Sequence, residues 1–418
     1  MFRFLMPLLL LLSGSALAQG SFPLDSAWAS ARRHYPLLRQ QEATDRATAL
    51  QLRNIRTGYL PQAELNGKAT YQSDVVQIPI KLPNVSIPSI PKDQYNLSLD
   101  VRQLIYDGGA TTGQRDLQLA RQQADRQKVE VDLHQLRQQV TQVYFNALIW
   151  DAHITARHEM IAEVKQRRQK LQAGVDNGTV LASQVDMLQA EALKGEQQLE
   201  EAINGKQAAL ATLALLTGKT ESEMNALVLP APAATGNAPL QRPELALFRF
   251  QQEVLGSQAK LTESLTRPKL SAFVQGGYGR PGLNLLSDKF DFYYMGGLRL
   301  NWTLWNWRYQ RTERAVLHEQ ETGIQAQSEA FDLQTRAKLL QQQAEISTLQ
   351  TAMEKDKEIV ELRGKVKNVS AAQLDNGVMT VHDYLTDLYA ETSAVIAGRT
   401  REIQFVYATI QYQVIKGY

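Results

Sequence analysis

Cysteine is absent from this chain of 418 residues, so disulfide bonds and thiolate metal sites are excluded. Histidine is scarce, and no carboxylate–histidine zinc motif is formed by the six that occur, which are His34, His134, His153, His158, His318 and His382. We expect structural or solvated roles for them. No phosphate-binding loop and no catalytic arrangement is recognisable either. The sequence therefore predicts no metal, no cofactor and no enzymatic activity.

An excess of one charge is also missing, because 45 basic residues nearly balance 43 acidic ones, for a net charge of +2. That balance argues against a nucleic-acid binder and against a basic membrane-surface patch. After Ala18, no run of about 18 apolar residues occurs, so no transmembrane helix is predicted. Entry into a membrane would therefore require strands closed into a barrel.

The start of the chain, at 1–18, is predicted to be a cleaved export signal. Arg3 supplies the positive start, Leu8–Leu12 the apolar centre and Ala16-Leu17-Ala18 a small-residue cleavage site. No cysteine follows that site, so the exported protein is not expected to be a lipoprotein.

Proline is missing from two long tracts, one between Pro91 and Pro230 and one from Pro281 to the final residue, Tyr418. Proline in a helix interior costs about 3 kcal/mol, so both tracts are free to form long helices. Their nearly equal lengths suggest a duplication. Arg242-Pro243 follows Tyr35-Pro36 by 207 positions, and Asp375-Asn376-Gly377 follows Asp176-Asn177-Gly178 by 199. We interpret this as a tandem repeat of about 200 residues.

Each repeat is predicted to read helix, strand, strand, long helical hairpin. The first repeat is expected at 19–220, with a helix at 25–57, strands near 62–72 and 95–106 and a hairpin at 108–217. A linker at 221–240 precedes the second repeat at 241–418, with strands near 269–279 and 293–305 and a hairpin at 308–416. The predicted class is mainly α with a β-barrel contribution of four strands per chain.

The four strands alternate between apolar and polar residues, with Phe273 as the exception. A sheet packed on a soluble core would alternate in the same way. Here, however, aromatic residues gather at both strand ends: Tyr71, Tyr95, Tyr278, Tyr293 and Tyr294 on the loop side, and Tyr59, Tyr106, Trp302, Trp305 and Trp307 on the helix side. Two aromatic girdles around an apolar band are typical of a transmembrane barrel. Asp100, Arg102, Arg299 and Asn301 are then predicted to face its lumen.

Four strands cannot close a barrel, for which about eight are needed, and an open edge in lipid costs several kcal/mol for each unpaired backbone group. The chain is therefore expected to pool strands with copies of itself. Three copies would provide a 12-stranded barrel and a hollow cylinder of helices.

The two Asp-Asn-Gly turns are predicted to end long helices, because Asn-Gly supplies a left-handed residue there. We expect both turns at the end of the helical cylinder farthest from the membrane. Asp186 and Asp383 follow the two glycines, Gly178 and Gly377, and would place carboxylates near that opening. A ring of carboxylates would favour cations.

Several segments, taken in order, resemble the TolC-like outer-membrane factor family. They are Gly58–Pro61 before the first strand, Gln103–Gly109 after the second, and the duplicated turns at Gly178 and Gly377. The resemblance implies a homotrimeric channel-tunnel in the outer membrane of a diderm bacterium, with a 12-stranded barrel and a long periplasmic α-barrel. It further implies docking onto a periplasmic adaptor and an inner-membrane pump of RND or ABC type, in efflux or type I secretion.

The resemblance also assigns residues of the second turn, where Thr380 and Asp383 match the family. Met379 stands where some members carry a basic residue, and Gln184 where an acid is often found, so an ion-pair lock is not predicted. Apolar contact among Val180, Leu181 and Met379 is the alternative closure. The alternative function is a soluble periplasmic adaptor or a coiled-coil structural protein.

Overall fold

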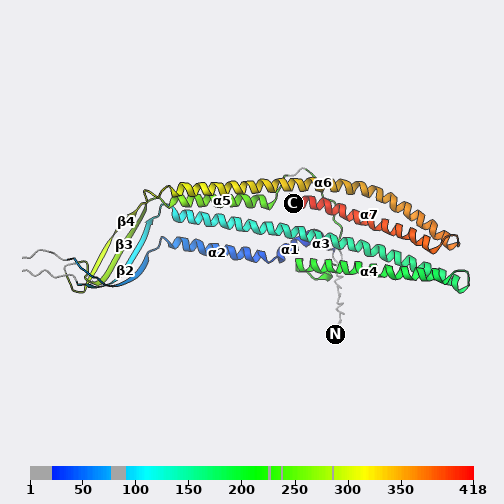
Figure 1. Ribbon diagram of the computed structural model, residues 1–418, viewed down its shortest axis with the longest axis horizontal. Coiled ribbons are helices and arrows are strands. Elements are labelled where there is room, and N and C mark those ends of the chain that lie inside the picture. Colours follow the sequence, from blue (N-terminus) through cyan, green and yellow to red (C-terminus); the bar gives the residue numbers. More distant parts are fainter. Residues whose placement is uncertain (1–20, 77–90, 225–226, 237–238, 285–286) are drawn as a thin grey trace, which may run out of the picture. The chain divides into compact units, whose positions relative to one another are not determined.

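The computed structural model describes residues 21–76, 91–224, 227–236, 239–284 and 287–418 (Figure 1). The predicted export signal lies outside these residues. The first half comprises α1 (Leu24–His34), α2 (Leu37–Thr57), β1 (Gln62–Tyr71), β2 (Asp93–Tyr106), α3 (Ala110–Asp176), α4 (Ala182–Thr217) and the short 3-10 helix η1 (Glu221–Met224). The second half comprises α5 (Pro243–Ser264), β3 (Lys269–Arg280), β4 (Asp291–Asn301), α6 (Tyr309–Asp375) and α7 (Val381–Lys416).

The order of elements repeats, since α2-β1-β2-α3-α4 is followed by α5-β3-β4-α6-α7. The lengths repeat as well: α3 and α6 each contain 67 residues, and α4 and α7 each contain 36. A mainly helical fold with four strands is thereby confirmed.

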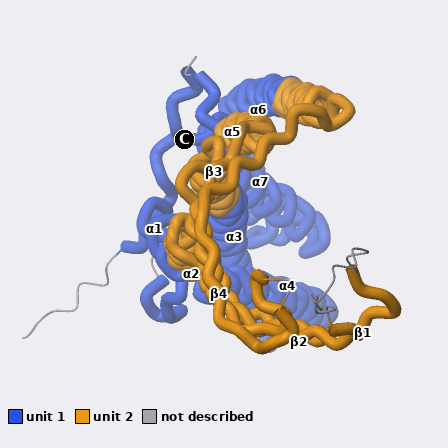
Figure 2. The backbone as a smooth tube through the Cα atoms, turned by 90° about the vertical axis from the view of Figure 1, so that its left-hand side faces the viewer, with its two compact units in different colours: residues 1–38, 130–243, 332–418 blue, residues 39–129, 244–331 orange. Residues whose placement is uncertain are grey.

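The chain forms two compact units, and each unit draws on both halves of the sequence (Figure 2). Unit 1 contains residues 1–38, 130–243 and 332–418, and unit 2 contains residues 39–129 and 244–331. Both long helices, α3 and α6, contribute one segment to each unit. The two compact units therefore do not coincide with the two predicted sequence repeats at residues 19–220 and 241–418.

Two predicted boundaries were wrong, and proline explains both. The single helix expected at 25–57 is broken, because α1 ends before Tyr35, whose ψ of 123° is extended. Pro36 follows, and a residue that precedes proline avoids the helical region. The last strand was expected to reach residue 305 but ends at Asn301, which pairs with Lys269. The residue before Lys269 is Pro268, which has no N–H to extend the ladder.

The four strands form one antiparallel sheet in unit 2, in the order β1-β2-β3-β4. The register places Leu65 opposite Leu99, Leu99 opposite Gly276, and Gly276 opposite Tyr294. Because side chains alternate along a strand, the predicted apolar residues of all four strands share one face. We call it the apolar face; it carries Leu65, Leu97, Leu99, Val274, Leu298 and Leu300. The opposite, polar face carries Glu64, Asn66, Asp100, Arg102, Gln275 and Arg299.

The helical hairpins of unit 1 share one hydrophobic cluster. Its buried members are Met160, Ile161, Val164, Leu171, Val185, Leu188, Ala192, Leu374, Val381, Tyr384, Leu385 and Leu388. They come from α3, α4, α6 and α7, so the two hairpins pack against each other. The small residues of α4 allow close approach to α3: a Cβ on Gly205 would lie 2.5 Å from the Trp150 ring, and one on Gly195 would lie 2.8 Å from Met160.

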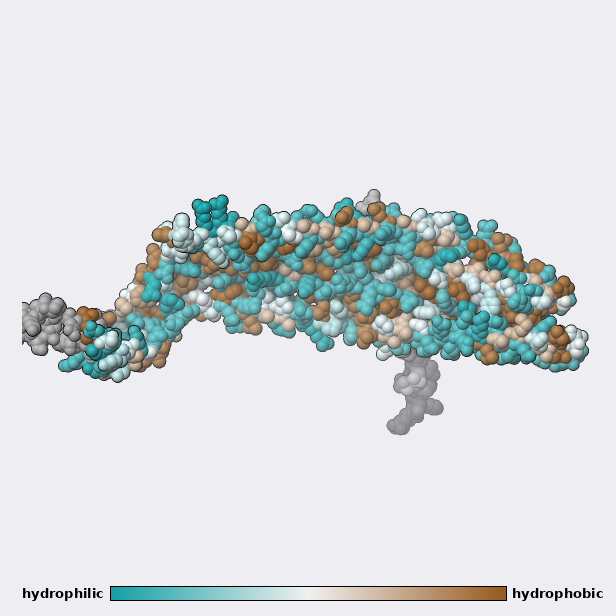
Figure 3. Space-filling model, viewed as in Figure 1, coloured by the Kyte–Doolittle hydropathy of each residue, from teal (hydrophilic) through white to brown (hydrophobic). Residues whose placement is uncertain are grey.

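The outer surface of the helices is mostly hydrophilic, with hydrophobic residues scattered over the visible face (Figure 3). Within the described part of the chain, no helix is both long enough and apolar enough to cross a membrane. One helix carries a row of exposed apolar residues at steps of three and four: Ile359, Leu362, Val366 and Val369 of α6. We call this row the α6 seam.

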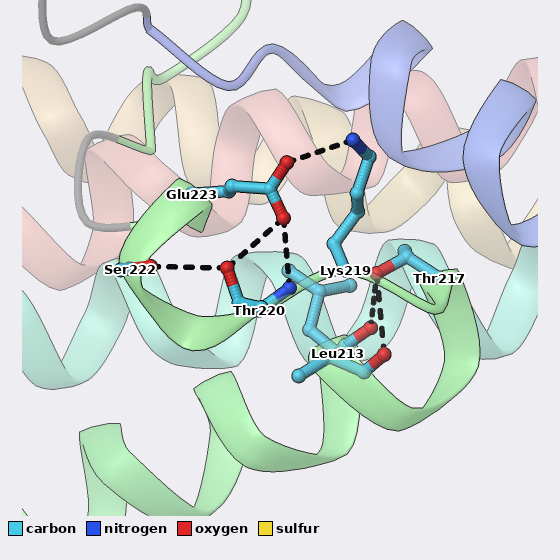
Figure 4. A network of polar contacts seen from close by, with 7 residues as sticks. Leu213, Thr217, Lys219, Thr220, Ser222 and Glu223 are labelled. Atoms are coloured by element: carbon cyan, nitrogen blue, oxygen red, sulfur yellow. Dashed lines mark hydrogen bonds and ion pairs between the residues drawn. The ribbon is translucent and has the colours of Figure 1, made fainter.

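Local bonds organise the chain after α4 (Figure 4). Gly218 adopts a left-handed φ of 68° and ends the helix, and the backbone N–H of Thr220 then donates to Glu223 at 2.9 Å. The ammonium of Lys219 reaches the same carboxylate at 2.8 Å. Hydrogen bonds from Lys219 and from Thr220 lower the pKa of Glu223 to about 2. The bond from the Thr220 N–H to the Glu223 side chain is one half of a capping box, and it stabilises the start of η1.

Candidate functional site

The two hairpin turns have the same backbone geometry. Gly178 and Gly377 both adopt a φ of 71°, and their N–H groups donate to Val175 and Leu374 at 2.9 and 3.0 Å. The predicted helix termination by Asn-Gly is correct. A Cβ built on either glycine would meet no atom within 4 Å. These glycines are therefore required by their dihedral angles and not by packing, and they border open space.

The second turn is capped and the first is not. Thr380 Oγ1 accepts a hydrogen bond from the backbone N–H of Asp383 at 3.2 Å and donates to its carboxylate at 2.7 Å. Leu181, at the equivalent start of α4, makes no side-chain cap. Asp186 and Asp383 are both exposed, as a role at an entrance requires, but Asp383 also stabilises the first turn of α7.

The apolar residues of the turns divide into two groups. Val180 and Met379 pack on the hydrophobic cluster of unit 1. Leu181 and Val378 project outward, with 70% and 77% of their surface exposed. Leu181 was predicted from the sequence, whereas Val378 was not. An intermolecular contact at the turns would therefore use Leu181 and Val378, because Val180 and Met379 already serve the chain's own core.

A polar network lies behind the turns, in unit 1. Arg167 of α3 pairs with Asp375 of α6, and its guanidinium lies 5.1 Å from the ring centre of Tyr384 on α7. The hydrogen bond from Arg167 holds the pKa of Asp375 below its usual value. Lys170 adds a weaker contact to Asp375 at 3.8 Å. An ion pair that the family pattern did not predict therefore joins the two hairpins within one chain.

A second carboxylate extends the network. Glu163 of α3 accepts from the Tyr384 hydroxyl at 2.8 Å and from Lys367 at 3.0 Å. Burial, and then the hydrogen bond to Glu163, raises the pKa of Tyr384 above its ordinary value. None of the four residues of this network, Glu163, Arg167, Lys367 and Tyr384, was predicted from the sequence. Glu163 and Arg167 stand four positions apart, which indicates a shared helix face, but the spacing does not say what that face contacts.

Among the described residues, none buries the apolar face of the sheet. Leu65, Leu298 and Leu300 expose 70%, 69% and 65% of their surface. Folding of the described residues therefore leaves this face open. Large exposed apolar patches on a protein mark contact with a membrane or with another protein.

The predicted loop-side girdle is an aromatic cluster on the apolar face. The ring of Tyr278 lies 4.6 Å from that of Phe292 and 5.5 Å from that of Phe290, and Tyr95 stacks on Phe290 at 6.1 Å. Tyr71 and Tyr294 are almost fully exposed. Phe290 and Phe292 were missed, although their aromatic type and position are visible in the sequence.

The helix-side aromatic residues are exposed too. Trp305 and Trp307 lie edge to face at 6.0 Å, and Trp302 and Tyr106 are exposed by 58% and 49%.

Two tyrosines proposed for the girdles have other positions. Tyr59 donates to Asp107 at 2.9 Å. Tyr293 lies on the polar face, where its hydroxyl and the amide of Asn96 exchange hydrogen bonds of 2.7 and 2.9 Å. Neither phenol is therefore placed as a girdle residue. The error for Tyr293 arises because Tyr293 and Tyr294 are adjacent, and adjacent strand residues point to opposite faces.

The residues predicted to line a lumen share the polar face. Asp100 accepts hydrogen bonds from Asn66 at 2.7 Å and from Ser98 at 3.0 Å. Arg102 lies opposite Phe273, and Arg299 and Asn301 extend the same face toward the helix side. The face thus offers the two guanidinium groups of Arg102 and Arg299 and one carboxylate held by hydrogen bonds.

A protein-family model matches just under half of this chain. Residues 28–219 match the family model described as outer membrane efflux protein. No curated protein sequence matches the chain.

Three solved structures show the fold. The outer membrane protein VceC from Vibrio cholerae is 15% identical, with a TM-score of 0.67 over 93% of this chain and 95% of that one. A membrane protein from Pseudomonas aeruginosa is 14% identical, with a TM-score of 0.71 over 94% and 90%. The Campylobacter jejuni outer membrane channel CmeC is 15% identical, with a TM-score of 0.68 over 94% and 84%. The predicted resemblance to the TolC-like outer-membrane factor family is thereby confirmed, by the family match over residues 28–219 and by the fold of the described chain.

Proposed function

We propose that this chain is one protomer of a homotrimeric outer-membrane channel that lets exported compounds pass passively out of a diderm bacterium. The single observation that carries the proposal is the sheet with two unlike faces. All four strands align their apolar residues on one open face and their polar residues on the other. Such a sheet suits lipid on one side and water on the other.

The free energy of burial supports lipid as the occupant of the apolar face. Covering a leucine side chain contributes about 1.5–3 kcal/mol, and several leucines of this face are at least half exposed. Exposed aromatic rings occur at both ends of the strands, where tyrosine and tryptophan prefer the boundary between lipid and water.

Self-assembly follows from the sheet edges. In the described sheet, β1 and β4 each pair on one side only. An unpaired strand edge costs several kcal/mol for each backbone group in lipid, so β4 of one copy must pair with β1 of the next. Three copies would close a barrel of 12 strands, within the range of known outer-membrane barrels.

The α6 seam supports association of the helical parts as well. Ile359, Leu362, Val366 and Val369 are exposed by 46%, 51%, 45% and 57%. Their spacing is that of a coiled-coil contact, which buries such residues against a neighbouring helix. A second copy of the chain provides that neighbour in the proposed trimer.

The turns are the proposed docking points for a periplasmic adaptor, behind which an inner-membrane pump of RND or ABC type supplies the energy. Leu181 and Val378 offer exposed apolar contacts, and Gly178 and Gly377 border open space. The assembly would serve drug or metal efflux or type I secretion. We further propose that residues 1–18 direct export and that no lipid anchor follows.

The proposal is tested by extracting the full chain from outer membranes with detergent and measuring its mass and its conductance in planar bilayers. A detergent-dependent trimer that forms conducting pores is the expected result. A monomer that is soluble without detergent would overturn the proposal and would favour the periplasmic adaptor instead.

A further inference from the structure

Phe273, the one apolar residue that interrupts the polar pattern of its strand, has a defined position on the polar face. It lies in a row with Gln62, Arg102 and Gly297, each contributed by a different strand. A Cβ on Gly297 would lie 3.2 Å from Cε1 of Phe273. The missing side chain at position 297 therefore makes room for the ring to lie over β4.

The Phe273 ring supports a guanidinium group. The Cζ atom of Arg299 lies 5.1 Å from the ring centre, within the range of a cation–π contact. Such stacking orients the flat guanidinium and leaves its N–H donors available. Arg299 is exposed in spite of this contact, so a dissolved molecule can reach it.

A small cavity joins this pair to a second arginine. It has a volume of about 250 Å³, and its lining includes Arg102, Phe273, Met295 and Arg299. Neither Arg102 nor Arg299 forms an ion pair with another described residue of the sheet. The cavity therefore combines two guanidinium groups that form no ion pair with a described residue, an aromatic ring and a thioether.

The carboxylates of the same face lie one row farther from the helices. Glu64 and Asp100 also line the cavity and stand opposite each other, two positions from Gln62 and Arg102 along their strands. Two strand positions correspond to about 6.6 Å. Asp100 is occupied by its hydrogen bonds from Asn66 and Ser98. Positive charge thus gathers on the helix side of the cavity, where Lys269 adds a third base.

We propose that Arg102, Arg299 and Phe273 form a binding station for the anionic group of organic anions that pass along the polar face. The inference rests on the proposed channel function and names a substrate class for it. Guanidinium groups bind carboxylates, sulfonates and phosphates through paired hydrogen bonds. The ring of Phe273 and the sulfur of Met295 contact the apolar part of the same molecule. Glu64 and Asp100 repel the anion and confine it to the basic rows.

Pyrenetetrasulfonate, an aromatic polyanion, is a suitable probe. Its fluorescence anisotropy is titrated with the full chain in detergent, and its block of the open pore is recorded in bilayers. The double variant Arg102→Gln/Arg299→Gln is expected to weaken binding at least about tenfold, because each charge-assisted contact it removes contributes on that scale. Arg102→Lys/Arg299→Lys keeps the charge and is expected to lose less.

Lys68→Gln is the matched control, because it removes one positive charge from the same face, six strand positions from Gln62. It is expected to leave binding within about twofold of the unchanged chain. Equal affinity of the double variant and the unchanged chain would overturn the station. That result in a conducting pore would leave the channel function intact. Probe binding that depends on both arginines in a protein without conductance would instead support the station and refute the channel.

Discussion

Arg126 of α3 donates a hydrogen bond from Nε to Oδ1 of Asp45 in α2, over 2.8 Å. The equivalent residues of the second repeat are Gln325 of α6 and Gln252 of α5, which are joined by a hydrogen bond of 3.2 Å. The sequence offsets of the repeat thus reappear as equivalent contacts within unit 2. The first repeat has an ion pair where the second has a neutral amide pair, so the two repeats share the contact but not its charge.

Leu300→Arg is predicted to block assembly, because it places a charge on the apolar face. Leu300 is the second-last residue of β4, and the cost of an arginine on the lipid face falls from about 2–4 kcal/mol at mid-membrane to about 0–1 kcal/mol near the interface; a trimer repeats this cost three times. Trimer yield after detergent extraction measures the effect. Asn301→Arg, on the adjacent residue of the opposite face, is the matched control and is expected to assemble. A normal trimer yield for Leu300→Arg would refute the assignment of the faces.

Arg167→Gln is predicted to loosen the contact between the two hairpins of unit 1. Its partner Asp375 has a lowered pKa in the folded chain. The pair therefore stabilises the fold at pH values above the pKa that Asp375 has in the unfolded chain. This stabilisation is lost as the pH falls through the pKa of Asp375 in the folded chain. We expect faster hydrogen exchange of the backbone amides near Asp375 at pH 7 in the variant. The difference should disappear in acid.

Arg168→Gln changes the neighbouring arginine and serves as the control for this prediction. It is expected to leave exchange near Asp375 unchanged at both pH values. An equal effect of the two variants would show that general charge, and not the Arg167–Asp375 pair, holds the hairpins.

Asp383→Ala is predicted to shift the ion selectivity of the reconstituted pore toward anions, since it removes carboxylates expected at the entrance. The same change also removes the hydrogen bond that the Thr380 hydroxyl donates to the Asp383 carboxylate, whereas the cap bond from the Asp383 backbone N–H to Thr380 Oγ1 is kept. Asp383→Asn removes the charge but keeps a hydrogen-bonding side chain. A selectivity shift in both variants supports the entrance role, and a shift in Asp383→Ala alone assigns it to the lost hydrogen bond from Thr380.

Gly377→Ala is predicted to destabilise unit 1 by about 1 kcal/mol, because alanine at a φ of 71° is strained. No clash contributes, since a Cβ there would meet no atom. Gly364→Ala, inside α6 and equally open, is expected to stabilise by about 0.5–1 kcal/mol. Thermal unfolding of both variants checks the opposite signs. Stabilisation by Gly377→Ala would contradict the dihedral argument.

The left-handed pair that precedes each long helix shows where prediction reached its limit. In the first repeat it is Gly108-Gly109, with φ of 72° and 88°, and glycine signals such a turn. The equivalent residues of the second repeat are Trp307 and Arg308, with φ of 56° and 61°. Neither residue type favours that region, so only the surrounding structure, and the equivalence of the two repeats, accounts for it.

The sequence by itself determined the features that depend on neighbouring residues. These are the alternation of the strands, the length of the proline-free helices and the two Asn-Gly turns, because each follows from backbone dihedrals and from the period of side chains along the chain.

Only the tertiary structure decided which distant groups meet. Arg167 and Asp375 are 208 residues apart, and Phe273 lies over Gly297 only because the strand register brings them together. Val180 is covered and Val378 exposed for the same reason. Contacts of this kind depend on the path of the whole chain, and local periodicity carries no information about that path.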